Sequence, residues 1–214
     1  MKIATITVVL AAAAIGAGCT TTLSRSRDLG NPNVPAKTLA EQVCSNCHNV
    51  DGNSINPTFP KLAEQQQEYI IGQLTMFRSH HRDDPPGFEY MWGISRSLTD
   101  AQIKGLAKYF SSQKSVPLAP GNPKLAAIGK QIFHDGLPAK GVPPCASCHG
   151  DHGQGNGLFP RIAYQHADYV IKQLNVFQRT NERPDGVVMK TITHSLDHKN
   201  MEAVAAYLRG MTAK

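Results

Sequence analysis

The sequence predicts an all-α protein built from two tandem helical domains that arose by duplication. The pattern Cys-x-x-Cys-His occurs twice in the 214 residues, at 44–48 and at 145–149. Apolar residues around both copies recur at i, i+3 and i+4, the spacing of one helical face. The segments that follow the two copies also echo one another, and an internal repeat of this length indicates two copies of one structural unit.

The repeated pentapeptide predicts covalent haem attachment. Two thiols three positions apart face the same side of a helical turn, so both reach the vinyl groups of one porphyrin. The histidine that follows is placed to ligate the iron from the proximal side. Two haem c groups are therefore expected. The predicted attachment and iron-ligand residues are Cys44, Cys47 and His48 in the first copy and Cys145, Cys148 and His149 in the second.

Two other uses of a Cys-x-x-Cys pair are a thiol–disulfide redox centre and half of a zinc site. A thioredoxin-like redox pair needs a βαβ context, and no strand-rich segment precedes either copy. A zinc site gives no reason for a histidine directly after each pair. Both alternatives are therefore weaker than haem, and no structural disulfide is expected.

The N-terminus has the pattern of an exported protein. A basic start is followed by 13 apolar residues, too few to span a bilayer reliably, and then by Gly16-Ala17-Gly18-Cys19. Residues 1–19 are interpreted as a signal peptide. The segment also resembles a bacterial lipobox, although Gly16 occupies the usual leucine position. Lipidation of Cys19, plain cleavage and an uncleaved anchor remain open. A periplasmic location is expected, with a lipid anchor to the membrane if Cys19 is modified.

The domain limits follow from composition and helical periodicity. Residues 20–35 are interpreted as a Pro/Asn-rich tether, 36–111 as the first domain, 112–123 as a linker and 124–214 as the second domain. The elements expected in the first domain are a helix ending in the first motif, a loop at 49–60, a helix at 64–80, a loop at 79–91, and a last helix opened by a capping box at 99–102.

The second domain repeats this order. Residues 159–162 and 169–174 echo 59–62 and 69–74, and Asp197 is expected to cap the last helix. An insertion at 135–144 separates the opening helix from the second motif.

Met91 and Met189 are the candidates for the sixth iron ligand. Each lies seven residues before a leucine that opens the last helix, and they are the methionines that match between the halves. Both are expected in loops that fold back over the open haem face, where a thioether ligand raises the potential. The alternative is that these methionines only fill the core.

The remaining histidines are rivals for the same position. None has a counterpart in the other half, so they are interpreted as surface groups or as groups near the iron ligands. His194 is the best rival because it lies near Met189. The seven are His80, His81, His134, His152, His166, His194 and His198.

Two prolines are candidates to support the proximal histidines. Pro60 and Pro160 follow His48 and His149 by 12 and 11 residues. A ligating histidine normally donates its other ring N–H to a carbonyl or carboxylate, and these proline carbonyls are suitably placed. The alternative is an ordinary loop proline.

Charge is distributed unevenly along the chain. Residues 30–115 hold 8 Lys/Arg and 8 Asp/Glu, whereas 116–214 hold 11 and 7. A basic second half could steer docking to an acidic redox partner, or it could simply be a solvated surface. No basic run or interleaved aromatic residues suggest nucleic acid binding.

Residues 30–214 resemble the cytochrome c4 family, di-haem proteins with two class I cytochrome c domains in tandem. The resemblance rests on both Cys-x-x-Cys-His motifs, Phe-Pro at 59–60 and 159–160, Met91 with Leu98-Thr99-Asp100, and Met189. It implies His/Met ligation of both haems, a pseudo-twofold pair of domains with the haems near their interface, and electron delivery toward terminal oxidases in the bacterial periplasm. Asn49 departs from the pattern, since Gly150 follows the second histidine, and residues 88–92 are bulky beside Met91.

The leading interpretation is an electron carrier without catalytic activity of its own, working with a membrane oxidase or dehydrogenase. One alternative is a di-haem peroxidase-like enzyme, which would need an open iron site. Others are the cytochrome subunit of a dehydrogenase complex and a fixed component of a respiratory complex.

Overall fold

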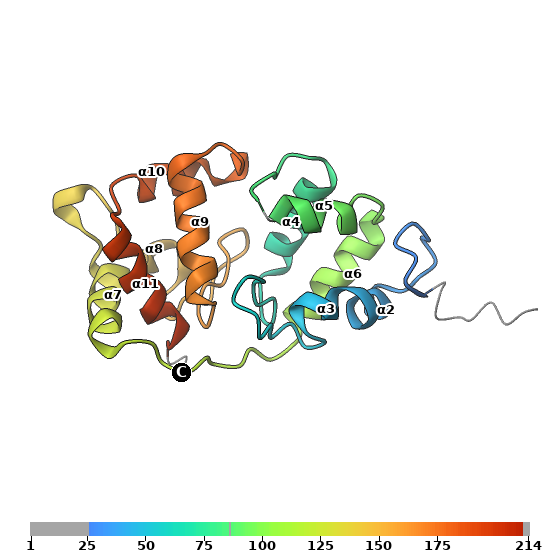
Figure 1. Ribbon diagram of the computed structural model, residues 1–214, viewed down its shortest axis with the longest axis horizontal. Helices are drawn as coiled ribbons and strands as arrows, with labels where there is room; N and C mark the ends of the chain where they lie inside the picture. The colour runs from blue at the N-terminus through green and yellow to red at the C-terminus, as the bar shows by residue number, and fades with distance from the viewer. Residues whose placement is uncertain (1–25, 86, 212–214) are drawn as a thin grey trace, which may run out of the picture.

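The computed structural model describes residues 26–85 and 87–211, and within them every regular element is helical. Two isolated β-bridges are the only extended pairings in this part of the chain. The molecule consists of two helical halves side by side, joined by a linker that runs along one edge (Figure 1). The signal segment, including Cys19, lies outside the described residues. No helix within 26–85 and 87–211 is long and apolar enough to span a bilayer.

The first half forms around six helical segments. In order they are α2 (Ala36–Leu39), the π-helical turn η1 (Ala40–Cys44), α3 (Ser45–His48), α4 (Gln67–Arg78), α5 (Gly87–Ser95) and α6 (Asp100–Ser111).

The second half repeats this arrangement with two added 3₁₀ turns. Its elements are α7 (Pro123–Asp135), η2 (Pro138–Lys140), α8 (Ala146–His149), α9 (Ala167–Arg179), η3 (Pro184–Gly186), α10 (Val187–Thr193) and α11 (His198–Arg209). The turn η2 falls in the insertion expected at 135–144, where Leu137 and Val142 pair their backbones.

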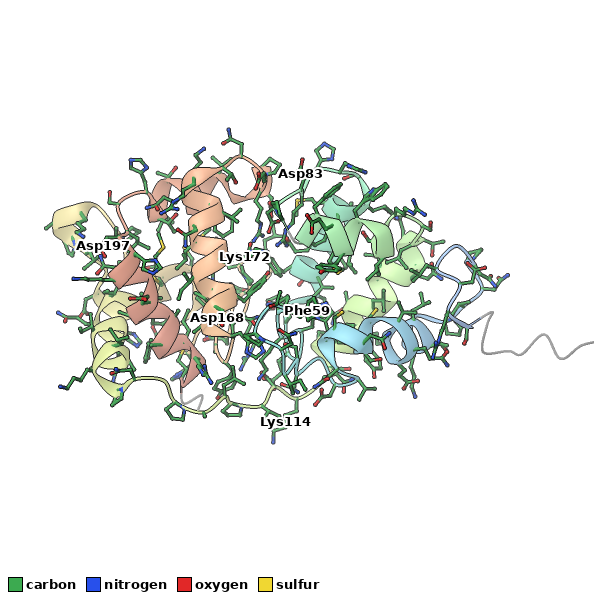
Figure 2. The ribbon with its side chains drawn as sticks, in the orientation of Figure 1. Phe59, Asp83, Lys114, Asp168, Lys172 and Asp197 are labelled. Carbon is green, nitrogen blue, oxygen red and sulfur yellow. The ribbon has the colours of Figure 1, made fainter. Side chains whose placement is uncertain are left out.

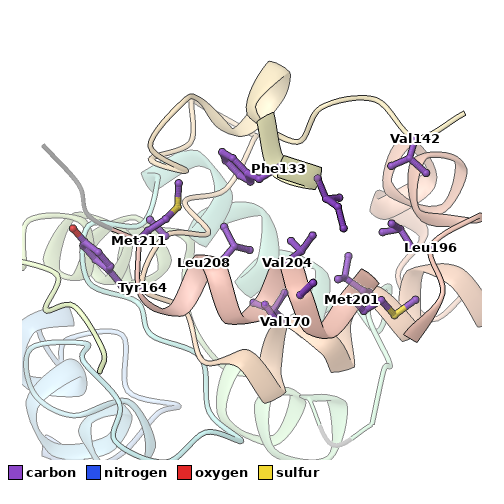
Figure 3. Packing of buried hydrophobic residues seen from close by; sticks show 14 residues of the cluster. Phe133, Val142, Tyr164, Val170, Leu196, Met201, Val204, Leu208 and Met211 are labelled. Atoms are coloured by element: carbon purple, nitrogen blue, oxygen red, sulfur yellow. The ribbon is translucent and has the colours of Figure 1, made fainter. Parts of the chain in front are cut away.

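Each half has its own hydrophobic core. In the first, Leu39, Ile103 and Leu106 are almost fully buried where α2 crosses α6. In the second, Phe133 of α7 packs with Met201 and Leu208 of α11, and α9 closes the cluster from the other side (Figure 3). Each core therefore assembles the opening, middle and closing helices of its own half, as expected for a duplicated domain.

Small residues let the opening and closing helices approach closely. In the first half, a Cβ built on Gly105 of α6 would stand 2.5 Å from the Cβ of Ala36. In the second half, a Cβ on Gly129 of α7 would stand 1.9 Å from the carbonyl oxygen of Ala203 in α11. The glycine lies on the closing helix in one half and on the opening helix in the other, but both crossings need one.

The predicted starts of the two closing helices are confirmed. The Thr99 hydroxyl accepts from the Gln102 N–H and the Gln102 side chain accepts from the Thr99 N–H, which forms a capping box. Asp197 accepts from the Asn200 N–H at 2.9 Å and caps α11.

The structure corrects the expectation that the two candidate methionines lie in loops. Met91 is inside α5 and Met189 is inside α10. In the first half, residues 88, 91, 92 and 95 fall at i, i+3, i+4 and i+7, a helical pattern obscured by the preceding Asp-Asp-Pro-Pro run.

The end of the segment interpreted as a tether also differs from expectation. Val34 is buried and Leu29 packs against the first core. The Gln102 side chain donates to the carbonyls of Asn31 and Val34, at 3.0 and 3.1 Å. Residues 29–34 are therefore fixed on α6 by apolar contacts and hydrogen bonds that local composition does not reveal.

Candidate haem-binding sites

Each Cys-x-x-Cys-His motif ends a helix and then turns sharply. Cys44 ends η1 and His48 ends α3, while Cys145 precedes α8 and His149 ends it. The next residue has positive φ in both halves, 60° at Asn49 and 78° at Gly150. With ψ of 161° at Asn49 and 156° at Gly150, both residues adopt a conformation that strongly favours glycine, so Asn49 makes the same turn at a cost in backbone strain.

After each turn the chain loops back under the histidine. The Gly52 carbonyl accepts from the N–H groups of Leu62 and Ala63, and the Gly153 carbonyl does the same for Ile162 and Ala163. This pair of hydrogen bonds, present in both halves, holds the segment that contains each proline against the preceding histidine.

Both proximal histidines are buried and hydrogen-bonded in the same way. His48 is 6% exposed and its Nδ1 lies 2.8 Å from the Pro60 carbonyl oxygen. His149 is 7% exposed and its Nδ1 lies 2.9 Å from the Pro160 carbonyl oxygen. Because a carbonyl only accepts, Nδ1 must carry the hydrogen. Nε2 is then the nitrogen left to face a metal.

The environment keeps both rings neutral. Burial lowers the pKa of His48 and of His149, and the hydrogen bond to the proline carbonyl opposes this only in part. A neutral imidazole is the form that ligates iron. The sites therefore supply an oriented, unprotonated donor in each half.

Two of the four motif cysteines, one in each half, have a raised thiol pKa. All four are free. Burial raises the pKa of the Cys44 thiol to about 12 and that of Cys145 to about 11. A redox-active pair or a zinc site needs readily formed thiolate. Moreover, no group of three or more His, Cys, Asp or Glu residues within 26–85 and 87–211 could hold a metal ion. The Cys44 and Cys145 thiols are therefore poorly suited to a redox-active pair or a zinc site.

The methionine of the second half shares a core with its motif, and α5 of the first half contacts the loop after its motif. Met189 and Cys145 both pack against the core of the second half. In the first half, the Phe59 ring centroid lies 6.2 Å from that of His48 and 6.0 Å from that of Tyr90, the residue before Met91. The proximal loop and α5 therefore meet at Phe59.

The rival histidines differ in burial and contacts, and the His80 ring packs against Trp92 of α5 at a centroid distance of 4.5 Å. His194 is exposed, as are His80, His81, His152 and His198. His166 contradicts its interpretation as a surface group. It is 5% exposed, and its Nε2 lies 2.9 Å from the Ser54 carbonyl of the other half. The difference arises because the N-terminal end of α9, which follows His166, packs against the first half.

The interface between the halves contains polar residues that the sequence interpretation missed. Gln65 and Gln165 each bond the backbone of the opposite half, at Arg161 and Lys61. The reciprocal pattern gives the interface a local pseudo-twofold symmetry. The signal available in the sequence is a repeated glutamine just before the second helix of each half.

A second layer of this interface is charged and buried. Asp84 is fully buried and pairs with Arg82 at 2.6 Å, and the Gln173 side chain donates to it at 3.1 Å. Burial by itself raises the pKa of Asp84, but the adjacent Arg82 guanidinium holds it below its usual range. Arg183 donates to Gln73 and Gln173 from the other side. At the rim, the Asp83 N–H donates to the Glu182 carbonyl at 3.0 Å (Figure 2).

Comparison with known proteins agrees with this geometry. The cytochrome c family model matches residues 34–114 and again 126–212. Cytochrome c4 of Stutzerimonas stutzeri is 38% identical over 178 residues, covering 79% of this chain and 84% of that protein. The chain belongs to the cytochrome c4 family.

The tertiary structure matches as well. The crystal structure of reduced recombinant cytochrome c4 from Pseudomonas stutzeri superposes with a TM-score of 0.75 at 36% identity, covering 86% of this chain and 100% of that one. A protein named thiosulfate dehydrogenase electron acceptor, from Stutzerimonas stutzeri, is 30% identical over 187 residues and 82% of both chains.

Membership of the cytochrome c4 family establishes the cofactors and the general role. Two cytochrome c domains with a cysteine pair each imply two covalent haem c groups. The chain is a di-haem electron carrier of the cytochrome c4 type.

Proposed function

We propose that this chain carries electrons in the bacterial periplasm with both irons ligated by one histidine and one methionine. His48 and Met91 ligate the first iron, and His149 and Met189 the second. The observation that carries the proposal is the matched arrangement in the halves. Each has a buried imidazole bonded through Nδ1 to a proline carbonyl and a methionine on the short helix before the closing helix.

The residues around each iron act by holding and shielding. The bound haem supplies a one-electron redox couple. The proline carbonyls of residues 60 and 160 fix the ring orientation and tautomer of the proximal histidines. A thioether in the sixth position raises the potential and leaves no open position for a substrate. Two closed irons suit a carrier rather than a peroxidase.

The ligand assignment is tested with the ferric holo-protein and two variants, Met91→Ala and Met189→Ala. Each should lose about half of the weak near-red absorption band of methionine-ligated ferric haem, because each removes one of two thioethers. Met76→Leu on α4 is the matched control and should keep the whole band. A full band in either alanine variant would refute that ligand.

A terminal oxidase is the proposed electron acceptor, reached through the more basic second half, residues 124–214. Charge complementarity steers such encounters and is screened by salt. Oxidation of the reduced protein by membranes containing an oxidase should slow as ionic strength rises. A rate independent of salt would argue against electrostatic docking.

Accepting electrons from a dehydrogenase is the second candidate function. It is favoured by the likeness to the thiosulfate dehydrogenase electron acceptor. Rapid reduction of the ferric protein by a thiosulfate dehydrogenase with thiosulfate would support it. Reduction no faster than that of an unrelated cytochrome c would exclude it.

A peroxidase-like activity would require an open iron. The as-isolated reduced protein should therefore bind CO slowly, on the timescale of methionine dissociation. Rapid and complete CO binding would replace the carrier proposal with the enzyme alternative.

Export and anchoring rest on residues 1–19 alone. Lipidation at Cys19 should hold the mature protein in the membrane fraction, and Cys19→Ser should release it to the periplasm. Identical fractionation of both forms would rule out the lipid anchor and leave simple secretion.

A further inference from the structure

We infer that Arg78 and Gln178 are positioning residues for the sixth-ligand methionines, acting through a hydrogen-bonded strut. This rests on the proposed ligation by Met91 and Met189. The two residues occupy the same position, the C-terminal turn of the second helix in each half, α4 and α9. Neither is part of the haem motifs.

In the second half the strut has two steps. The Gln178 side-chain nitrogen Nε2 donates toward the Thr193 carbonyl at 3.0 Å, and the Thr193 hydroxyl donates to the Met189 carbonyl at 2.7 Å. The same Nε2 also lies 2.8 Å from the carbonyls of His194 and Leu196. The Gln178 amide therefore lies within hydrogen-bond distance of three carbonyls at and just after the end of α10. The Thr193 hydroxyl connects this end of the helix to the Met189 carbonyl.

In the first half different residues build the same connection. Arg78 Nη1 donates to the Leu98 carbonyl at 2.8 Å, and the Leu98 N–H donates to the Ser95 carbonyl at 3.0 Å. The Ser95 hydroxyl then donates to the Met91 carbonyl at 2.6 Å. Arg78 Nη2 is itself held by Asp100 at 2.7 Å.

The hydroxyl groups in both struts are fully enclosed. Ser95 is 0% and Thr193 is 1% exposed. A serine or threonine inside a helix that does not point to solvent can bond the carbonyl four residues earlier. In this chain the hydroxyl belongs to a buried residue, lies four residues after the proposed ligand in both halves, and is connected to the preceding core helix.

The strut should keep the methionine ligand bound to its iron. The carbonyls at the end of a helix have no intrahelical partner. Without Gln178, those at the end of α10 would lose their side-chain donor, and α10 would be free to swing away from the second core. Met189 would then leave the iron more readily, while His149, held by Pro160, would be unaffected.

The test measures the pH at which the methionine band of the ferric holo-protein disappears. Gln178→Leu keeps the side-chain bulk and removes the donor. It should raise the methionine-dissociated population of one haem about tenfold, because about one net hydrogen bond is lost. The pH midpoint at which the affected haem loses its methionine band should then fall by about one unit. A tenfold change in the methionine dissociation equilibrium corresponds to one pH unit. Thr193→Val should act in the same direction.

Two further variants separate positioning from general stability. Asn175→Ala, also on α9, removes a side-chain bond to the Ile171 carbonyl that does not reach α10, and should leave the pH midpoint unchanged. Gln178→Arg, which introduces the donor of the first half, should restore the midpoint lost in Gln178→Leu. A midpoint shift in Gln178→Leu no larger than that in Asn175→Ala, or no restoration by arginine, overturns the inference.

The outcome is distinguishable from failure of the ligand assignment. If Met189→Ala loses half of the band but Gln178→Leu keeps the normal midpoint, the ligand stands and the strut falls. If Met189→Ala keeps the whole band, the ligand itself is wrong and the strut has nothing to position.

Discussion

Gln165 of the second half bonds the backbone of Lys61 in the first half twice. Its Oε1 accepts from the Lys61 N–H at 2.9 Å, and its Nε2 donates to the Lys61 carbonyl at 3.1 Å. Gln65 makes the mirror pair with Arg161. Two flexible side chains thus satisfy four backbone groups at a buried interface, where unpaired groups are costly.

Gln165→Ala should loosen the contact between the halves. It leaves the Lys61 N–H and carbonyl buried without partners, a cost of about 1–3 kcal/mol. The thermal unfolding midpoint of the holo-protein should fall in scanning calorimetry. Gln66→Ala is the matched control, because its bond to the Gln154 carbonyl lies at an exposed rim and its loss should matter little. Equal midpoints for both variants would contradict the role of Gln165.

Gly129→Ala should destabilise the second half severely. The added methyl group would stand 1.9 Å from the Ala203 carbonyl oxygen, so α7 and α11 must separate. We expect a loss of about 3 kcal/mol in the free energy of unfolding, measured with guanidinium.

Gly72→Ala provides the opposite case. Gly72 lies in α4, and an added Cβ would meet no atom within 4 Å beyond its chain neighbours and the nearby backbone of its own helix. Alanine should therefore stabilise the helix by about 0.5–1 kcal/mol. Losses of similar size in both glycine variants would show that the helix crossing is not the cause.

His166 should make stability depend on pH. Burial lowers its pKa below the ordinary value of 6.5, the Ser54 carbonyl bond opposes this, and nearby Lys61 lowers it further. Between the lowered folded-state pKa and 6.5, the unfolded chain binds more protons than the folded chain. The free energy of unfolding therefore falls as pH falls through that window.

His166→Gln should reduce this acid sensitivity. Glutamine already occupies the matching position of the first half, at Gln66. Unfolding midpoints of the holo-protein between about pH 5 and 7.5 should fall less steeply with acid than in the wild type. His152→Gln, at an exposed site, should keep the wild-type slope. A variant slope equal to that of the wild type would exclude His166 as the titrating group.

Replacing both cysteines of one motif should remove one haem. The double variant Cys145→Ser and Cys148→Ser should retain one covalent haem per chain, because Cys44 of the other motif packs against the separate core of the first half. Mass spectrometry of the denatured protein counts the covalently attached groups. Two haems retained, or none, would contradict independent attachment in the two halves.

Several features of the fold were predictable from short-range patterns. The capping residues Thr99 and Asp197 act on groups within three residues of themselves, so local sequence contains the whole interaction. The methionine helices were harder to predict. α5 and α10 are only 9 and 7 residues long, and helices this short are marginal without packing.

The sequence alone determined the chemistry and the duplication. Two Cys-x-x-Cys-His motifs predict where haem is attached, and the repeat marks equivalent residues in each half. Only the tertiary structure decided how the halves fit together. The contacts of His166 with Ser54, and of Gln165 with Lys61, join residues more than 100 positions apart. No local pattern encodes such a contact, because it exists only after both cores have formed and their polar faces meet.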